Sequence, residues 1–209
     1  MEHIAQTLLE VGAVEVRPQE PFHYASGLKG PIYCDNRKLL SHTGARQKIR
    51  DAFVDLIREK KIDFDQLAGL ATAGIPHASF IADQLNCPMV YIRSKPKAHG
   101  KRNQIEGDAG PNQKLLLVED LVNQGASLEE ALLGVKDAGL AAIGCLAIVT
   151  YQSQAASEVL SKYDVPLYNL TDFDTLCRVA KEMGKIEEAD LELLKQWRED
   201  PKAWSEKHG

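Results

Sequence analysis

The sequence contains no long uninterrupted apolar segment. Among its 209 residues the longest such run is LAAIGCLAIV (140–149), well short of the roughly 20 residues that a membrane-spanning helix requires. The N-terminal stretch MEHIAQTLLEVGAVEV also lacks the basic region followed by an apolar core that marks a secretory signal. We therefore expect a cytoplasmic protein without a membrane partner.

Surplus positive charge and closely spaced cysteines are also missing. Lysine and arginine together number 25 against 30 aspartates and glutamates, which gives a formal charge of −5. Because contacts with nucleic-acid phosphates require surplus positive charge, we expect no nucleic-acid partner. The four cysteines lie far apart and form no C-x-x-C pair, so the sequence favours neither a zinc site nor a disulfide scaffold; they are Cys34, Cys87, Cys145 and Cys177.

Two common nucleotide-binding motifs are absent as well. The sequence has no G-x-G-x-x-G after a strand candidate and no G-x-x-x-x-G-K-[ST]. A dinucleotide site and a triphosphate site therefore lose their main sequence support.

Short apolar runs alternate with helix-period segments through the middle of the chain. Five runs bounded by Gly, Pro, Asn or Asp are strand candidates: QLAGLAT (66–72), PMVYIRS (88–94), KLLLVED (114–120), AAIGCLAIVT (141–150) and VPLYNL (165–170). Helices are predicted over 44–61, 75–86 and 127–139, and the last one opens with Ser127 and Glu130 in the spacing of a capping box. This alternation predicts parallel strands joined by crossover helices.

The two ends of the chain have a different pattern. The first forty residues hold a short amphipathic helix, followed by VEV and PIYCD on either side of the turn-like SGLKG, which predicts a small antiparallel element. From residue 171 the sequence is helical again. We expect a single domain over 1–209, with an N-terminal helix and hood element in 1–40, an α/β core in 41–170 and a helical tail in 171–209.

The segment VEDLVNQGAS holds the clearest chemical signal. Glu119 and Asp120 follow an apolar strand directly, and a short loop with Gly125 then enters a helix. Backbone N–H groups at a helix N-terminus favour an anion such as phosphate, and carboxylates accept hydrogen bonds from hydroxyls. The segment therefore predicts a site for a sugar phosphate with two free hydroxyls.

A basic segment follows PMVYI, at the end of the strand candidate 88–94. Residues 93–102 contain no acid and hold six basic or imidazole side chains: Arg93, Lys95, Lys97, His99, Lys101 and Arg102. Ligands of an open parallel sheet bind at the carboxyl ends of the strands. We therefore expect a polyanion to bind beside the sugar phosphate.

These segments resemble a known family. VEDLVNQGAS resembles the phosphoribosyl diphosphate signature of the type I phosphoribosyltransferases. ASGLKGPIYCDNR, GLATAGIPHA and RSKPKAHGKRNQIEG, in this order and spacing, are similar to the orotate phosphoribosyltransferases of many Gram-positive bacteria, and the resemblance extends to QWRED near the end. It implies an α/β fold with a central, mostly parallel sheet flanked by helices, a small N-terminal hood and a helical C-terminal tail.

The resemblance also implies an activity. This is the Mg²⁺-dependent transfer of the phosphoribosyl group from phosphoribosyl diphosphate to orotate, giving orotidine 5′-phosphate and pyrophosphate in pyrimidine (UMP) synthesis. The diphosphate substrate would carry most of the Mg²⁺ coordination, so no metal site made by the protein alone is expected. A homodimer is implied, in which the loop 93–107 of one subunit reaches the site of its neighbour.

Residue roles follow from the same resemblance. Catalysis is assigned to Lys97, His99 and Asp120. Phosphoribosyl diphosphate binding is assigned to Arg93, Lys97, His99, Glu119, Asp120, Leu121, Val122, Asn123, Gln124, Gly125, Ala126 and Ser127, and the Ala71 to Gly74 turn would offer amides to the pyrophosphate. Orotate binding is assigned to Asn123, Lys29 and Tyr151.

Two departures from the family pattern keep alternatives open. Asn123 and Gln124 are bulkier than the small or hydroxyl residues that the family usually has there, so a non-catalytic sensor of phosphoribosyl diphosphate stays possible on sequence grounds. Some members place an arginine about where this chain has Tyr151, so the cation that would bind the orotate carboxylate is unassigned apart from Lys29. A transferase for another base therefore also stays open. His77 is interpreted as a structural or surface residue.

Overall fold

The computed structural model describes residues 1–95 and 104–208. These residues group into two compact units. The terminal unit combines Met1–Arg46 with Thr171–Gly209, and the core unit is Gln47–Leu170. Across 1–95 and 104–208, no helix has both the length and the apolar character needed to cross a membrane.

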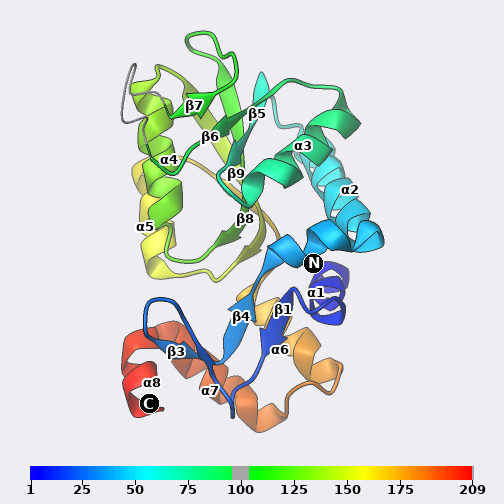
Figure 1. Ribbon diagram of the computed structural model, residues 1–209, viewed down its shortest axis with the longest axis vertical. Coiled ribbons are helices and arrows are strands. Elements are labelled where there is room, and N and C mark those ends of the chain that lie inside the picture. The colour runs from blue at the N-terminus through cyan, green and yellow to red at the C-terminus, as the bar shows by residue number, and fades with distance from the viewer. Residues whose placement is uncertain (96–103, 209) are drawn as a thin grey trace. The chain divides into compact units, whose positions relative to one another are not determined.

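The core unit is built on a six-stranded sheet with the strand order β10-β9-β8-β5-β6-β7 (Figure 1). Neighbouring strands from β9 through β8 and β5 to β6 are parallel, and β7 is antiparallel to β6. The mostly parallel sheet that the sequence predicts is therefore confirmed. The strands are β5 (Gln66–Leu70), β6 (Met89–Ile92), β7 (Ile105–Glu106), β8 (Lys114–Val122), β9 (Ala141–Thr150) and β10 (Leu167–Asp172).

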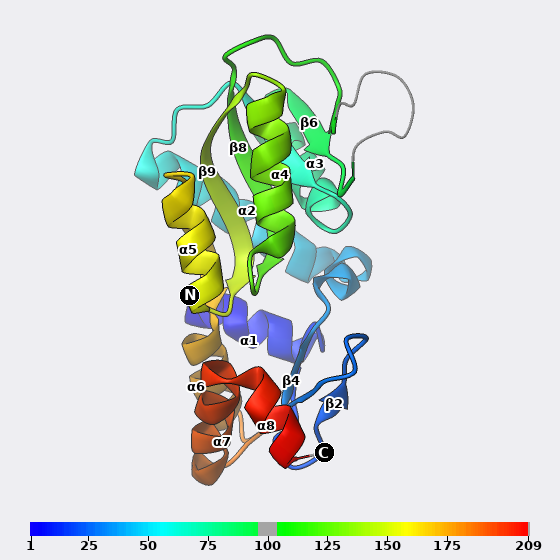
Figure 2. The same cartoon turned by 90° about the vertical axis from the view of Figure 1, so that its left-hand side faces the viewer.

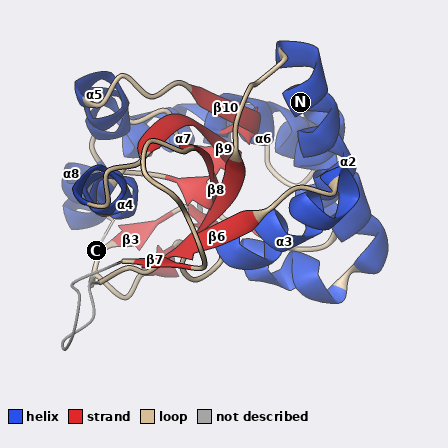
Figure 3. Cartoon of the chain, turned by 90° about the horizontal axis from the view of Figure 1, so that it is seen from above, coloured by secondary structure: helices blue, strands red, loops and turns tan. Residues whose placement is uncertain are grey.

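Helices cover both faces of this sheet. In Figures 1 and 3, α2 (Thr43–Lys60) and α3 (Gly74–Leu85) lie on one face, and α4 (Ala126–Asp137) and α5 (Gln154–Lys162) lie on the other. Figure 2 looks onto α4 and α5 with β8 and β9 behind them. Because both faces are covered, the central strands are mostly apolar, and every residue of β5 is buried.

Most of the predicted elements agree with the structure. The strand predicted at 141–150 is confirmed at both ends, and the helices predicted at 44–61 and 75–86 are confirmed to within a residue. The strand predicted to end at Asp120 continues to Val122, because β8 keeps pairing with β9 as far as Thr150. Helix α5 (Gln154–Lys162) and the short edge strand β7 are not predicted by the sequence pattern.

The capping box predicted at Ser127 is wrong. Helix α4 begins at Ala126, and its N-cap residue is Gly125 with φ 81°. Glycine adopts this left-handed conformation without a steric penalty, so the chain turns into the helix earlier than the Ser127 spacing indicates. Ser127 then lies inside the first turn of α4, close enough to Glu119 to influence the pKa of that residue.

The terminal unit contains the first and last elements of the chain. Strand β1 pairs antiparallel with β4, with Val14 opposite Cys34, which confirms the predicted VEV and PIYCD pairing. Helix α1 packs against α6. The elements are α1 (Glu2–Glu10), β1 (Val14–Val16), β2 (Phe22–His23), β3 (Lys29–Gly30), β4 (Ile32–Cys34), the 3-10 helix η1 (Asn36–Ser41), α6 (Phe173–Glu182), α7 (Glu188–Glu199) and α8 (Pro201–Lys207).

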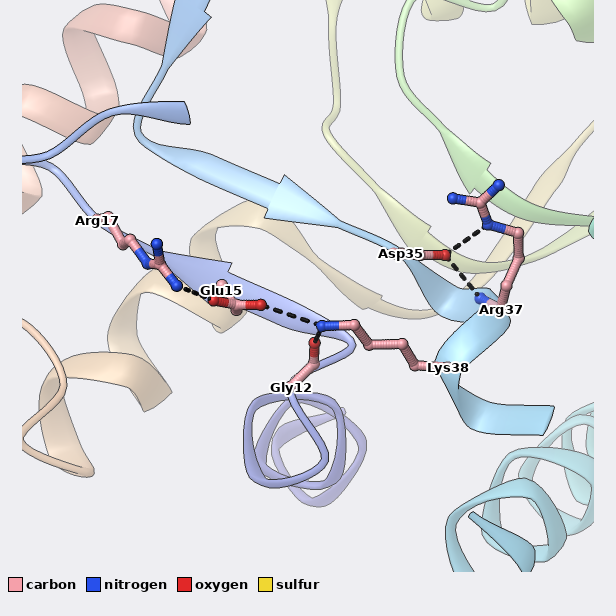
Figure 4. A network of polar contacts seen from close by, with 6 residues as sticks. All are labelled: Gly12, Glu15, Arg17, Asp35, Arg37 and Lys38. Carbon is pink, nitrogen blue, oxygen red and sulfur yellow. Dashed lines mark hydrogen bonds and ion pairs between the residues drawn. The ribbon is translucent and has the colours of Figure 1, made fainter. Parts of the chain in front are cut away.

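A polar network links η1 to β1 (Figure 4). The Lys38 ammonium donates to the Gly12 carbonyl at 2.8 Å and pairs with the Glu15 carboxylate at 3.1 Å. Arg17 approaches the same carboxylate at 2.5 Å. The Lys38 hydrogen bond, with help from Arg17, lowers the pKa of Glu15. These side chains are partly exposed, so we expect each pair to contribute little to stability.

We predict that Gly74→Ala destabilises the protein. A Cβ atom at Gly74 would lie 2.1 Å from the Val118 carbonyl oxygen, so α3 or the end of β8 would have to move. Overpacking of this kind lowers the free energy of unfolding by about 1–3 kcal/mol. Urea denaturation followed by far-UV circular dichroism measures the change.

Gly44→Ala is the matched control. A Cβ atom at Gly44 meets no atom within 4 Å, and the residue lies in α2. Alanine in a helix is more stable than glycine by roughly 0.5–1 kcal/mol, so this variant should be as stable as the parent or more so. Equal stability of the two variants would show that α3 does not require glycine at residue 74.

Candidate active site

The candidate segments after β5, β6 and β8 all leave the sheet on one side, at the carboxyl ends of these strands. In the parallel register, Leu70 at the end of β5 lies opposite Ile92 at the end of β6, and Gly69 lies opposite Val118 of β8. The segments that follow these positions therefore start beside one another. Such an edge is where open α/β sheets bind their ligands.

The turn between β5 and α3 packs against the end of β8. Its peptide bond between Ala71 and Thr72 is cis, and the Ala71 N–H donates to the Ile92 carbonyl at 2.8 Å. Gly74 lies so close to the Val118 carbonyl that any side chain would collide with it. The predicted 71–74 turn therefore lies directly beside the residues that precede the carboxylate pair.

Glu119 is buried at the end of β8. Glu119 is 7% exposed, whereas Asp120 is half-buried. The Glu119 carboxylate accepts a hydrogen bond from the Asp120 backbone N–H at 2.9 Å, and the Ser127 side chain also bonds to it. Burial raises the pKa of Glu119 to about 9, and the charge of Asp120 adds to this shift. Burial and the neighbouring charge therefore favour the protonated form of Glu119, which can donate a hydrogen bond, whereas a carboxylate can only accept one.

A small cavity opens beside this pair, between the end of β8 and the start of α4. Its volume is about 210 Å³. It is lined by Glu119, Leu121, Val122, Asn123, Gln124, Gly125, Ala126, Ser127 and Leu128. The first backbone amides of α4 lie in this lining, and the helix dipole makes such a position favourable for phosphate. The structure thus brings together one carboxyl group for a hydroxyl and a helix N-terminus for an anion.

The basic segment is described only in part. Arg93 directly follows β6, and its guanidinium pairs with Glu106 of β7 at 3.5 Å. Its backbone is held by Gln104, which accepts from the Arg93 N–H at 2.9 Å and donates to the Arg93 carbonyl at 3.1 Å. Lys97 and His99 lie outside the described residues.

Two residues assigned to orotate have partners within their own units. In the terminal unit, the Lys29 ammonium donates to the His208 carbonyl at 3.4 Å, and the Lys29 N–H donates to the Ser205 hydroxyl at 2.8 Å. Tyr151 of the core unit is 5% exposed, and its N–H donates to the Val122 carbonyl at 3.0 Å.

His77 is a buried ionisable residue near the pair. It lies one helical turn after Gly74, on the side of α3 that packs against β8, and is 3% exposed. Burial lowers the pKa of His77 to about 4, although the charge of Asp120 opposes that shift. The imidazole is therefore neutral at neutral pH. The three-residue spacing from Gly74 is the sequence signal that could have placed it beside the carboxylates.

Comparison with known proteins agrees with this geometry. A family model described as the phosphoribosyl transferase domain matches residues 35–177. The orotate phosphoribosyltransferase of Bacillus subtilis is 47% identical over 206 residues, covering 98% of this chain and 95% of the relative. That of Bacillus caldolyticus is 45% identical over 205 residues, covering 98% and 99%.

Solved structures show the same fold. The orotate phosphoribosyltransferase of Aeropyrum pernix is 26% identical with a TM-score of 0.74, covering 88% of this chain and 99% of that one. The UMP synthase of Leishmania donovani is 26% identical with a TM-score of 0.78, and this chain spans only 42% of its length. The chain therefore belongs to the phosphoribosyltransferase family. Its similarity over nearly the full length places it with the orotate phosphoribosyltransferases of that family.

We predict that the burial of Glu119 makes stability fall as pH rises. Because the pKa of Glu119 is higher in the folded protein than in the unfolded chain, the folded state binds more protons between pH 4.5 and about 9. The free energy of unfolding should therefore decrease through this window, with a slope of at most about 1.4 kcal/mol per pH unit from this group. Glu119→Gln should remove that part of the slope. Urea denaturation at several pH values between 6 and 9 measures it.

Glu15→Gln serves as the control. The pKa of Glu15 is lowered, so its contribution is lost only in acid, below the tested window. This variant should therefore differ from the parent by a constant amount between pH 6 and 9. A Glu119→Gln variant that also differs by a constant amount would contradict the retained proton.

Proposed function

We propose that this chain transfers the phosphoribosyl group of phosphoribosyl diphosphate to orotate, forming orotidine 5′-phosphate and pyrophosphate. The observation that carries the proposal is the cavity between the end of β8 and the start of α4, which Glu119 lines, with Asp120 as the next residue of the strand. A sugar phosphate matches this combination of carboxyl groups and helix amides. The similarity to orotate phosphoribosyltransferases over 98% of the chain supports the choice of base.

In this mechanism, the core unit holds the phosphoribosyl group at both ends. Amides of residues 123–127 bind the 5′-phosphate, and Glu119 and Asp120 bind the ribose hydroxyls. The 71–74 turn and Arg93, together with Lys97 and His99, bind the departing pyrophosphate. As the bond from C1 to the pyrophosphate oxygen breaks, negative charge grows on pyrophosphate and positive charge on the ribose. Fixed cations and amides stabilise the negative charge on pyrophosphate, and Asp120 stabilises the positive charge on the ribose.

Magnesium belongs to this proposal as a companion of the substrate. Among residues 1–95 and 104–208, no three His, Cys, Asp or Glu side chains gather as a metal site would require. The adjacent carboxyl groups of Glu119 and Asp120 offer oxygen donors, which fits a hard cation held mainly by substrate phosphates. Asp120 would contact it, because Asp120 is the more exposed of the two residues. When bound, Mg²⁺ would neutralise charge on the diphosphate.

The proposal extends to the orotate contacts, the assembly and the location. Asn123, Lys29 and Tyr151 are proposed to contact the base. The active form is proposed to be a cytoplasmic homodimer in which the loop 93–107 of each subunit completes its neighbour's site. Failure of orotate as a substrate would favour a transferase for another base or a sensor that only binds phosphoribosyl diphosphate.

An absorbance assay with purified protein tests the reaction. Orotate should be consumed when phosphoribosyl diphosphate and Mg²⁺ are both present, whereas uracil, hypoxanthine and xanthine should not react. Asp120→Asn should lower kcat on the order of 10²-fold, because it removes a charge that acts in the transition state. Asp137→Asn, the same change at an exposed position of α4, should keep the parent's rate. Consumption of a purine in place of orotate would reject the proposed base.

The dimer can be tested by mixing two inactive variants. Lys97→Ala/His99→Ala lacks the loop groups, and Glu119→Gln/Asp120→Asn lacks the carboxylates. In a mixed dimer, one site takes its loop from the carboxylate variant and its carboxylates from the loop variant, so that site is complete. A mixed dimer purified through two different tags should thus show about half the parent's activity. If it is as inactive as each variant alone, the loop acts within its own chain.

A further inference from the structure

The segment that follows β9 runs beside the loop that follows β8. Val122 lies opposite Thr150 at the ends of the two strands, and the Tyr151 N–H donates to the Val122 carbonyl at 3.0 Å. The loop of residues 123–125, which leads into α4, therefore leaves the sheet alongside residues 151–153, which lead into α5. We call residues 123–125 the β8–α4 loop.

A sharp turn then directs Ser153 at this loop. Gln152 has φ 55°, and its N–H donates to the Thr150 hydroxyl at 3.1 Å. After this turn the Ser153 hydroxyl donates to the Asn123 carbonyl at 2.5 Å. A carbonyl has no proton to give, so the hydroxyl must be the donor.

The same hydroxyl also caps α5. It accepts a hydrogen bond from the Ala156 N–H at 3.2 Å, so both its donor and an acceptor position are engaged. Ala156 itself packs against the β8–α4 loop, because a Cβ atom at Gly125 would lie 3.0 Å from its Cα. The first turn of α5 thus contacts the loop at both of its ends, through Ser153 at residue 123 and through Ala156 at residue 125.

We propose that Ser153 is a positioning residue for the 5′-phosphate, which rests on the proposed function of the cavity. In a trans peptide unit the C=O and the N–H point to opposite sides. Because Ser153 holds the Asn123 carbonyl toward α5, the Gln124 N–H is turned away from α5, toward the cavity that Gln124 lines. Ser153 fixes the amide in the orientation that a phosphate requires, without contacting the phosphate.

This role also accounts for the unusual side chains of the loop. Asn123 and Gln124 are both exposed. If the backbone is held from α5, the loop keeps its path whatever side chains occupy these exposed positions. The phosphate site then needs no small or hydroxyl residue at either of them.

Three variants at residue 153 separate the bond to the loop from the cap of α5. Ser153→Ala removes both, Ser153→Gly removes the bond to the loop while glycine remains a good N-cap residue, and Ser153→Thr retains both. Asp172→Ala is the matched control, since Asp172 caps α6 by accepting from the Thr175 N–H at 2.8 Å. It should lower the melting temperature, as Ser153→Ala does, without changing phosphate binding.

The measurement is titration calorimetry with ribose 5-phosphate and, separately, with pyrophosphate, alongside steady-state kinetics with orotate. Ser153→Ala and Ser153→Gly should weaken ribose 5-phosphate binding roughly three- to tenfold, as expected for one hydrogen bond. Pyrophosphate binding should not change. The KM for phosphoribosyl diphosphate should rise with little change in kcat, because the 5′-phosphate does not react. Ser153→Thr should bind and turn over as the parent does.

Three results would overturn the proposed role of Ser153. If the parent converts orotate and the Ala and Gly variants bind ribose 5-phosphate as tightly as it does, the proposed reaction stands and Ser153 is only a helix cap. If Asp172→Ala weakens ribose 5-phosphate to the same extent, the effect is a loss of general stability. If the parent neither converts orotate nor binds ribose 5-phosphate, the proposed function and the role of Ser153 are both wrong.

Discussion

The close approach of α3 to the end of β8 is the contact on which the site depends. Gly74 lies against the Val118 carbonyl, so the first turn of α3 meets the strand one residue before Glu119. This contact places the 71–74 turn next to the carboxylate pair and buries His77 beneath it. A larger residue at 74 would separate the turn from the strand. The relative position of two segments that we propose to bind substrate is therefore set by the absence of one side chain.

Burial then gives the two adjacent carboxyl groups different roles. Glu119 is almost completely removed from water, and its pKa rises to about 9, whereas Asp120 is half-buried. His77 is neutral because burial lowers its pKa to about 4, so it does not cancel the charge of Asp120. Burial therefore favours the protonated, hydrogen-bond-donating form of Glu119, while Asp120 is more open to water. A diol in which each hydroxyl both donates and accepts is well matched to such a pair.

Much of the core unit could be predicted from the sequence, because its strands are apolar runs and its turns carry Gly and Pro. The positions of β9, α2 and α3 follow from pattern alone. The predicted start of α4 at Ser127 was wrong, because Gly125 adopts the left-handed conformation and is the N-cap residue instead. Helix α5 was missed because it is short, although Ser153 is a good N-cap residue. The environment of Glu119 and the link from Ser153 to Asn123 depend on contacts between distant segments, which local pattern does not contain.

The β8–α4 loop shows why a motif defined by side chains can mislead. Asn123 and Gln124 are the residues that depart from the family pattern, yet both are exposed. The constrained residue is Gly125, because a side chain there would be strained by the positive φ and would press tightly against Ala156. Phosphate is bound chiefly through backbone amides at such a helix start. If the loop binds phosphate as proposed, it can vary at residues 123 and 124 without loss of the binding surface, provided that residue 125 is glycine and α5 holds the backbone in place.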